Sequence, residues 1–288
     1  MFEGFELETV AISDGQIRLR RGGSGPPLLL LHGHPRTHTT WHLVAPILAA
    51  AGFTVICLDL PGFGGSFQPA DHAGSSKRAK ARALAELMSR LGHRRFAVVG
   101  HDRGSYTAFR LAMDNPGRVA ALAVLDGVPI LEALERCTEN FARAWWHWFF
   151  FAVPEKPERA ILADPQAWYG GSPEAMGREN FADFQAAIRD PAVVHGMVED
   201  YRVSLTLDRA DDAADRAAGR RLACPTLCLW SKRDDLELLY GDPLAIWKPW
   251  TGSLEGGAID SGHHMAEEAP DELARRLLAF FRAVASWP

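Results

Sequence analysis

Four short apolar runs alternate with stretches of helical pattern in the first half of the chain. The runs occupy residues 27–31, 53–58, 96–99 and 119–125, and each is followed by a turn that contains glycine. Nearly continuous apolar character is typical of strands that are buried on both faces. Strands that alternate with helices pair in parallel, so the pattern predicts an α/β fold with a mostly parallel sheet flanked by helices.

Further strands extend this sheet at both ends of the chain. Alternating apolar and polar residues on both sides of Ser13-Asp14-Gly15 predict an antiparallel hairpin. Apolar runs at residues 224–230 and 256–260 add two more strands, and a helix is expected over residues 270–284. The expected sheet therefore has eight strands.

The alternation stops after Pro129, where the chain becomes helical in pattern, rich in aromatic residues and interrupted by proline. This part contains the run RAWWHWFFF at residues 143–151. We interpret it as a helical cap inserted into the sheet domain. The expected division is a core domain of residues 1–130 and 213–288 and a cap subdomain of residues 131–212.

Charge and composition exclude several kinds of partner. The 288 residues carry 36 acidic and 31 basic side chains, a formal net charge of −5, which disfavours binding to nucleic acid. The most apolar stretch, residues 144–153, is too short to cross a membrane. The four cysteines have neither zinc-finger nor CxxC spacing, so we expect reduced thiols in a cytoplasmic protein.

The stretch GHDRG at residues 100–104 follows a predicted strand and precedes a helical pattern. Gly100 and Gly104 permit a tight turn that raises the middle side chain above the sheet edge. This sequence of strand, turn and helix is that of the nucleophile elbow in the α/β-hydrolase fold. Asp102 is therefore the candidate nucleophile, at a position where a serine is usual.

An aspartate at this position predicts substitution at a saturated carbon. A serine that displaced a leaving group from such a carbon would become an ether, which water cannot cleave under enzyme conditions. Asp102 would instead form an ester, which activated water can hydrolyse to restore the carboxylate. We therefore expect cleavage of carbon–halogen bonds or opening of epoxides in place of ester or amide hydrolysis.

The turn LHGHP at residues 31–35 stands where such enzymes place one amide of the oxyanion hole. We assign the two amides of this hole to His34 and Arg103. The same segment contains four histidines, His32, His34, His38 and His42. A metal site is the alternative, but no acidic or cysteine ligand accompanies these histidines, and no metal is predicted.

A histidine after the last predicted strand would act as the base. The stretch SGHHMAEEAPDE offers His263 and His264, and we choose His263 because it directly follows Ser-Gly. An acid should orient this ring. Asp126 follows one predicted strand, and Asp234 and Asp235 follow the next, so the choice of acid stays open at this point.

Seven pieces of the sequence resemble one family of enzymes. They are HGHPRT, DLPGFGGS, VGHDRG, LAVLDGVP, WHWFF, VEDYR and SGHHMAEEAPDE, and they extend over nearly the whole chain. The family is that of the fluoroacetate and haloacetate dehalogenases, within the α/β-hydrolase superfamily. The resemblance implies a hydrolytic dehalogenase for small 2-haloacids, with Asp102 as nucleophile, His263 as base and Asp126 as acid. It also implies a homodimer.

The resemblance assigns two binding groups as well. His147, Trp148 and Tyr201 match the halide-binding residues of the family, and we call these three residues the halide cradle. The family holds the substrate carboxylate with two arginines, of which Arg103 matches the first. Tyr106 stands at the second position, where it can donate one neutral hydrogen bond but lacks the charge and the bidentate fork of an arginine.

Two other functions stay open. Epoxide hydrolysis uses the same aspartate together with two acidic hydroxyls, for which the cap offers Tyr169 and Tyr201. The other is a non-catalytic binding or regulatory protein, which a complete set of nucleophile, base and acid disfavours. No cofactor is expected, because LPGFGGS has neither the spacing of a dinucleotide-binding loop nor the lysine of a phosphate loop. The expected partner is a small molecule, a halogenated carboxylate.

Overall fold

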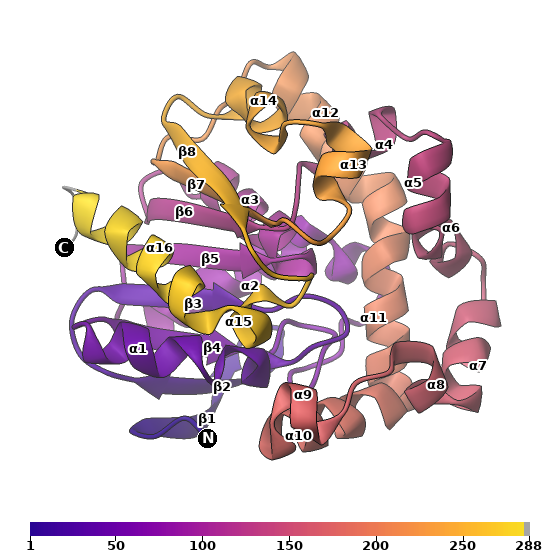
Figure 1. The fold of residues 1–288 in the computed structure, drawn as a ribbon, viewed down its shortest axis with the longest axis horizontal. Helices are drawn as coiled ribbons and strands as arrows, with labels where there is room; N and C mark the ends of the chain where they lie inside the picture. The colour runs from indigo at the N-terminus through magenta and orange to yellow at the C-terminus, as the bar shows by residue number, and fades with distance from the viewer. Residues whose placement is uncertain (285–288) are drawn as a thin grey trace.

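The computed structural model describes residues 1–284 and contains one sheet of eight strands (Figure 1). The strands are β1 (Phe5–Ile12), β2 (Gly15–Gly22), β3 (Pro27–Leu31), β4 (Thr54–Leu58), β5 (Phe96–His101), β6 (Val119–Leu125), β7 (Thr226–Ser231) and β8 (Leu254–Ile259). Their order in the sheet is β1-β2-β4-β3-β5-β6-β7-β8. The pairs β1–β2 and β2–β4 are antiparallel and the other pairs are parallel. The predicted α/β-hydrolase fold is confirmed.

Helices cover both faces of the sheet. They include α1 (Val44–Ala50) and α16 (Pro270–Ala283) on one face and α2 (Lys77–Arg90) and α3 (Arg103–Asp114) on the other (Figure 1). In β3, Leu28 and Leu30 join the apolar core beneath α1 and α16. Leu29 and Leu31 join the core beneath α2 and α3. This burial on two sides explains why the strand sequences are apolar without interruption.

Short helices complete the sheet domain. They are the 3-10 turns η1 (His38–Trp41), η2 (Ala73–Ser75) and η4 (Lys248–Trp250) and the helices α13 (Leu236–Tyr240), α14 (Pro243–Trp247) and α15 (Met265–Glu268). The predicted hairpin is confirmed as β1 and β2, and the predicted closing helix as α16. The strand expected over residues 256–260 begins two residues earlier, at Leu254.

A helical insertion connects β6 to β7. We call its helices the cap helices: α4 (Ile130–Glu135), α5 (Glu139–Ala144), α6 (His147–Phe151), α7 (Lys156–Ala163), α8 (Pro165–Tyr169), α9 (Pro173–Met176), α10 (Arg178–Arg189), α11 (Pro191–Val203) and α12 (Arg209–Ala217). A π-helical segment, Ser204–Asp208, joins α11 to α12. Figure 1 shows α5 to α11 gathered at one side of the sheet. The exact cap boundaries, residues 131–212, stay a prediction.

Two further observations concern the state of the cysteines and the length and apolar character of the helices. All four cysteines are free, and Cys137 is the exposed one. Within residues 1–284, no helix has the length and apolar character that a membrane crossing requires.

Candidate active site

Asp102 lies at a strained turn between β5 and α3. Its φ is 49°, in the left-handed region, where side chains are seldom found without a compensating role. Gly100 allows this turn to close, because a Cβ atom there would lie under 3.0 Å from the backbone of Gly104. The chain therefore makes the strand–turn–helix elbow that its sequence predicts, with the carboxylate at the tip.

Replacing Gly104 with alanine is expected to lower the free energy of unfolding by about 2–3 kcal/mol. The added Cβ would lie under 3.0 Å from the carbonyl oxygens of Leu31 and His32, and these backbone atoms cannot move without distorting the end of β3. Gly117→Ala is the matched control, because nothing lies within 4 Å of its Cβ position. Urea unfolding measures both variants, and equal stabilities would contradict this close packing.

Two backbone amides face the Asp102 carboxylate. The N–H of His34 donates to Oδ1 at 2.7 Å, and the backbone of Arg103 also hydrogen-bonds the carboxyl group. Burial alone would raise the pKa of Asp102, but the charges of His263 and Arg103 and the backbone hydrogen bond lower it. The carboxylate of the candidate nucleophile is thus ionised, and both amides predicted for the oxyanion hole contact it.

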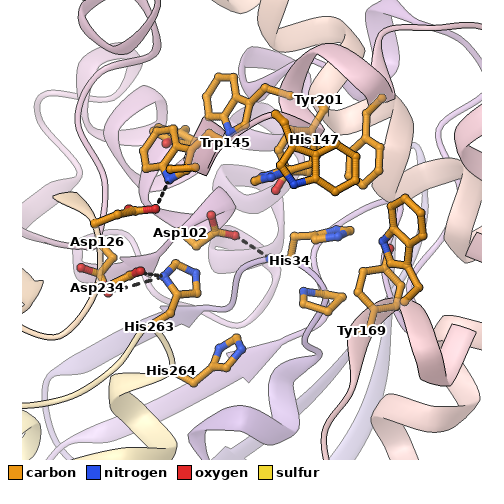
Figure 2. Close-up of a pocket in the computed structure, with 18 of the residues that line it drawn as sticks. His34, Asp102, Asp126, Trp145, His147, Tyr169, Tyr201, Asp234, His263 and His264 are labelled. Atoms are coloured by element: carbon orange, nitrogen blue, oxygen red, sulfur yellow. Dashed lines mark hydrogen bonds and ion pairs between the residues drawn. The ribbon is translucent and has the colours of Figure 1, made fainter. Parts of the chain in front are cut away.

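His263 lies in the loop after β8, where the carboxylates of Asp126 and Asp234 both approach Nδ1 (Figure 2). Nδ1 is 2.8 Å from Oδ2 of Asp234 and 3.7 Å from Oδ2 of Asp126. Asp126 instead accepts hydrogen bonds from the Ser231 hydroxyl and, at 2.7 Å, from the Ser231 N–H. The geometry therefore favours Asp234 as the acid that orients His263. Asp126, the acid that the resemblance implies, fixes the end of β7.

The carboxylates around His263 keep its ring protonated. Burial alone would lower its pKa, but the hydrogen bond to Asp234 and the charges of Asp102 and Asp126 raise the pKa of His263 to about 10. Conversion of Asp102 to a neutral ester would remove one of these charges. The pKa of His263 would then fall, so the ring would become a base at the step that requires one.

These groups open into a cavity of about 470 Å³, which the whole halide cradle lines (Figure 2). The ring centroids of His147 and Trp148 lie 5.4 and 5.7 Å from that of Tyr201. Burial lowers the pKa of His147 to about 4, so its ring is neutral and keeps one N–H. Within the described residues 1–284, no group accepts a hydrogen bond from these three side chains. Their donors are free to bind a ligand.

Trp145 and Asp235 line the same cavity and contact the halide cradle through Trp148. Nε1 of Trp145 donates to Oδ2 of Asp235 at 2.8 Å, and the indole stacks on Trp148 with centroids 5.6 Å apart. Burial and the adjacent charge of Asp234 raise the pKa of Asp235 to about 6. Sequence reasoning missed this pair, because the two residues are 90 positions apart and only the fold brings them together.

The two residues predicted to bind a substrate carboxylate are placed differently. Tyr106 lines the cavity, whereas Arg103 does not. Arg103 is fully buried, and its Nε donates to Oδ2 of Asp200 at 2.5 Å. The structure therefore brings the backbone amide of Arg103, but not its guanidinium, to the candidate site.

Asp200 lies next to the candidate site, and sequence reasoning missed it. It lies on α11, where it holds Arg103 and two lysines of α2. Asp200, Ser204 and Asp208 recur at four-residue intervals, a spacing that places them on one face of a helix. That spacing is the sequence signal for a buried polar face at this position.

Within residues 1–284, two groups of side chains have the spacing that a metal ion could use. The first comprises His101, Asp126 and His263, and the second comprises His38, Asp59 and Asp183. In the first group, the ring of His101 already hydrogen-bonds the carbonyl of His263 at 2.8 Å. In the second group, Arg18 contacts Asp59 at 3.3 Å and Asp183 at 2.6 Å, so it supplies the positive charge that a metal would bring.

Known proteins resemble this chain over almost its full length. A family model described as the alpha/beta hydrolase fold matches residues 26–270. A fluoroacetate dehalogenase from Burkholderia sp. is 40% identical, with 97% of this chain and 95% of the relative covered. A soluble epoxide hydrolase from Corynebacterium sp. strain C12 is 32% identical, with 90% of this chain and 91% of the relative covered.

The structure has close neighbours as well. A crystal structure from Nostoc sp. PCC 7120, described as an alpha/beta hydrolase, has a TM-score of 0.94 and 38% identity, with 98% of this chain and 100% of that chain covered. The family model, the sequence relatives and the structural neighbour agree with the fold described above. The chain is a hydrolase, and it belongs to the α/β-hydrolase family.

Proposed function

We propose that this hydrolase cleaves carbon–halogen bonds. The observation that carries the proposal is the halide cradle, three neutral donors that line the same cavity as the Asp102 carboxylate. A departing halide gains negative charge in the transition state, and fixed donors in a cavity shielded from bulk water stabilise such charge. The 40% identity to a fluoroacetate dehalogenase supports the same reaction.

The reaction would take place in two steps. An oxygen of Asp102 forms a bond to the halogenated carbon, and the carbon–halogen bond breaks as the halide leaves with its electron pair into the halide cradle. Water then attacks the ester carbonyl while His263 takes its proton, and the amides of His34 and Arg103 hold the oxyanion. Collapse of this intermediate releases the alcohol and restores Asp102.

The finer predictions from the sequence are separate from this proposal. A small 2-haloacid as substrate requires a positive group that can reach the substrate carboxylate, and Arg103 is the candidate from the sequence. The cytoplasmic location and the homodimer also stay predictions.

Halide release tests the proposal directly. The purified protein is assayed with an ion-selective electrode on chloroacetate, fluoroacetate, 2-chloropropionate and a neutral primary chloroalkane, and Asp102→Asn is the control. We expect catalytic halide release from at least one compound and none with the variant. Release that persists in Asp102→Asn would contradict the assigned nucleophile.

Epoxide hydrolysis is the second candidate. Tyr169 and Tyr201 both line the cavity, where two hydroxyls could protonate the opening epoxide oxygen, and the epoxide hydrolase from Corynebacterium is a relative. Styrene oxide serves as the probe in a parallel assay for diol. Diol formation that depends on Asp102, without halide release from any of the organohalides, would favour this candidate.

Replacing Trp148 with phenylalanine tests the halide cradle. The change removes the indole N–H and keeps an aromatic ring against Trp145, so kcat/KM for a chlorinated substrate is expected to fall about tenfold. The loss should be larger for a fluorinated analogue, because fluoride accepts stronger hydrogen bonds than chloride. A Trp148→Phe variant with unchanged kcat/KM for both halogens would reduce Trp148 to a packing residue.

A further inference from the structure

The guanidinium of Arg103 faces α11 and is bound to it by hydrogen bonds. Nε donates to Oδ2 of Asp200 at 2.5 Å, and Nη2 donates to the backbone oxygen of Asp200 at 2.7 Å. Nη2 also donates to the hydroxyl of Ser204. The side chain is fully buried, and its remaining nitrogen, Nη1, is buried without a hydrogen-bond partner in the described structure. Three of the five N–H groups of this arginine are thus paired inside the protein, and its charge is balanced by Asp200.

Three aromatic rings lie between this charge and the cavity. The guanidinium carbon is 4.0 Å from the ring centroid of Tyr201 and 5.0 Å from those of Tyr106 and Trp148. These three residues line the cavity, whereas Arg103 does not. A substrate carboxylate in the cavity therefore meets the edges and faces of these rings before it can meet the arginine.

Asp200 cannot release Arg103 easily, because it also balances two other buried cations. Nζ of Lys77 lies 2.8 Å from Oδ1 of Asp200, and Nζ of Lys80 contacts the same oxygen. Asp208 is the second carboxylate of this cluster, 3.5 Å from Lys77. Removing one partner from a buried ion pair leaves an uncompensated charge, so the cluster holds Arg103 in place.

The charges that do line the cavity are mostly negative. Among the described residues 1–284, no lysine or arginine lines it, whereas four carboxyl groups do: those of Asp102, Asp126, Asp234 and Asp235. Burial lowers the pKa of three of the four lining histidines, which are therefore neutral. The fourth, His263, is already paired with Asp234. An anionic substrate would add a further negative charge to a cavity that no lysine or arginine of the described residues lines, which is costly in a buried site.

The size and the remaining wall of the cavity indicate what it can hold. Its volume of about 470 Å³ lies in the range of about 300–1,000 Å³ that buries drug-sized ligands, far more than a haloacetate fills. Trp146, Phe151 and Trp168 form one wall, in which Trp168 stacks on Phe151 with centroids 6.3 Å apart. Such a wall binds flat apolar groups.

We propose that the cavity accepts an uncharged primary organohalide with an aromatic or other apolar group, and that it discriminates against halogenated carboxylates. This inference rests on the proposed dehalogenation by Asp102. The neutral donors of Tyr106, Trp148 and Tyr201 can hold the halide and one neutral acceptor of the substrate, and none of them requires a negative charge.

The test compares three probes on the wild-type protein: chloroacetate, its neutral isostere chloroacetamide, and N-benzylchloroacetamide. Halide release gives kcat/KM for each probe. This value is divided by the rate constant for the reaction of the same probe with a small thiol, which removes differences in intrinsic reactivity. We expect a normalised kcat/KM at least tenfold higher for chloroacetamide than for chloroacetate, and higher again for the benzyl compound. Equal or faster turnover of chloroacetate would overturn the inference.

Asp102→Asn separates this inference from the proposed function. It also corrects for alkylation of Cys137, the exposed thiol, which would release one halide per chain without turnover. Halide release from chloroacetate alone that is lost in Asp102→Asn would support the proposed function and overturn the inference. No release from any probe that depends on Asp102 would overturn both.

Tyr106→Arg tests the reason for the discrimination, and Tyr106→Phe is the matched control. An arginine on the cavity wall would supply the missing cation, so the ratio of kcat/KM for chloroacetate to that for chloroacetamide should rise at least tenfold. The phenylalanine variant should leave this ratio low. An unchanged ratio in a folded arginine variant would contradict charge as the determinant, and the wild-type ratio decides the inference if that variant does not fold.

Discussion

Replacement of His263 by glutamine is expected to stop the reaction after one halide per enzyme. Asp102 would still attack, because the N–H of His34 and the backbone of Arg103 still hold its carboxylate, but no base would activate water against the ester. Steady-state turnover should fall by about 10²–10⁴-fold. Rapid-mixing measurement of halide should show a burst equal to the enzyme concentration and then almost no further release.

The trapped ester provides an independent readout of the same variant. The intact protein should gain the mass of the substrate less hydrogen halide, and proteolysis should locate this mass on the peptide that contains Asp102. His264→Gln is the control, because His264 lines the same cavity but makes no contact with Asp234 in the described structure. Full turnover of the His263 variant, or a burst without the added mass, would contradict the two-step reaction.

The sheet was predictable because its signals are local. Strands buried on both faces are continuously apolar, and in β3 alternate leucines serve the two cores. The hairpin turn and the elbow are likewise local, since glycine allows conformations that other residues avoid. The π-helical segment Ser204–Asp208 was not predicted, and its contact with Lys77 of α2 joins residues that are far apart in the sequence.

Within the candidate site, the sequence predicts only the residues whose chemistry requires one residue type at one place in the fold. Asp102 and His263 stand out because the elbow and the loop after the last strand have fixed places in the fold. The choice between Asp126 and Asp234 depends on side-chain directions that the sequence does not contain. The position of the Arg103 guanidinium depends on Asp200, a carboxylate from a distant helix.

Asp234→Asn is expected to lower turnover by about 10²–10⁴-fold while the first halide is still released. The carboxylate accepts the N–H of His263 Nδ1 at 2.8 Å, which fixes the ring and leaves Nε2 free to take a proton from water. An asparagine amide has nearly the same size, but it no longer stabilises the imidazolium that forms. Burst and steady-state halide release, measured in one experiment, distinguish this effect from loss of the nucleophile.

The pH dependence of turnover tests the same interaction between Asp234 and His263. Asp126→Asn is the matched control. Asp234 raises the pKa of His263, so the pKa of His263 should be lower in the Asp234→Asn variant. Turnover rises with pH as His263 loses its proton, so this limb of the pH profile should move to lower pH in the variant. Asp126→Asn should move this limb in the same direction but less far, because Asp126 acts on His263 by its charge and Asp234 by a hydrogen bond as well. Asp126→Asn should also lower the free energy of unfolding by about 1–3 kcal/mol, because it weakens the bonds to Ser231. A larger loss of turnover in Asp126→Asn than in Asp234→Asn, with both variants folded, would assign the orienting role to Asp126.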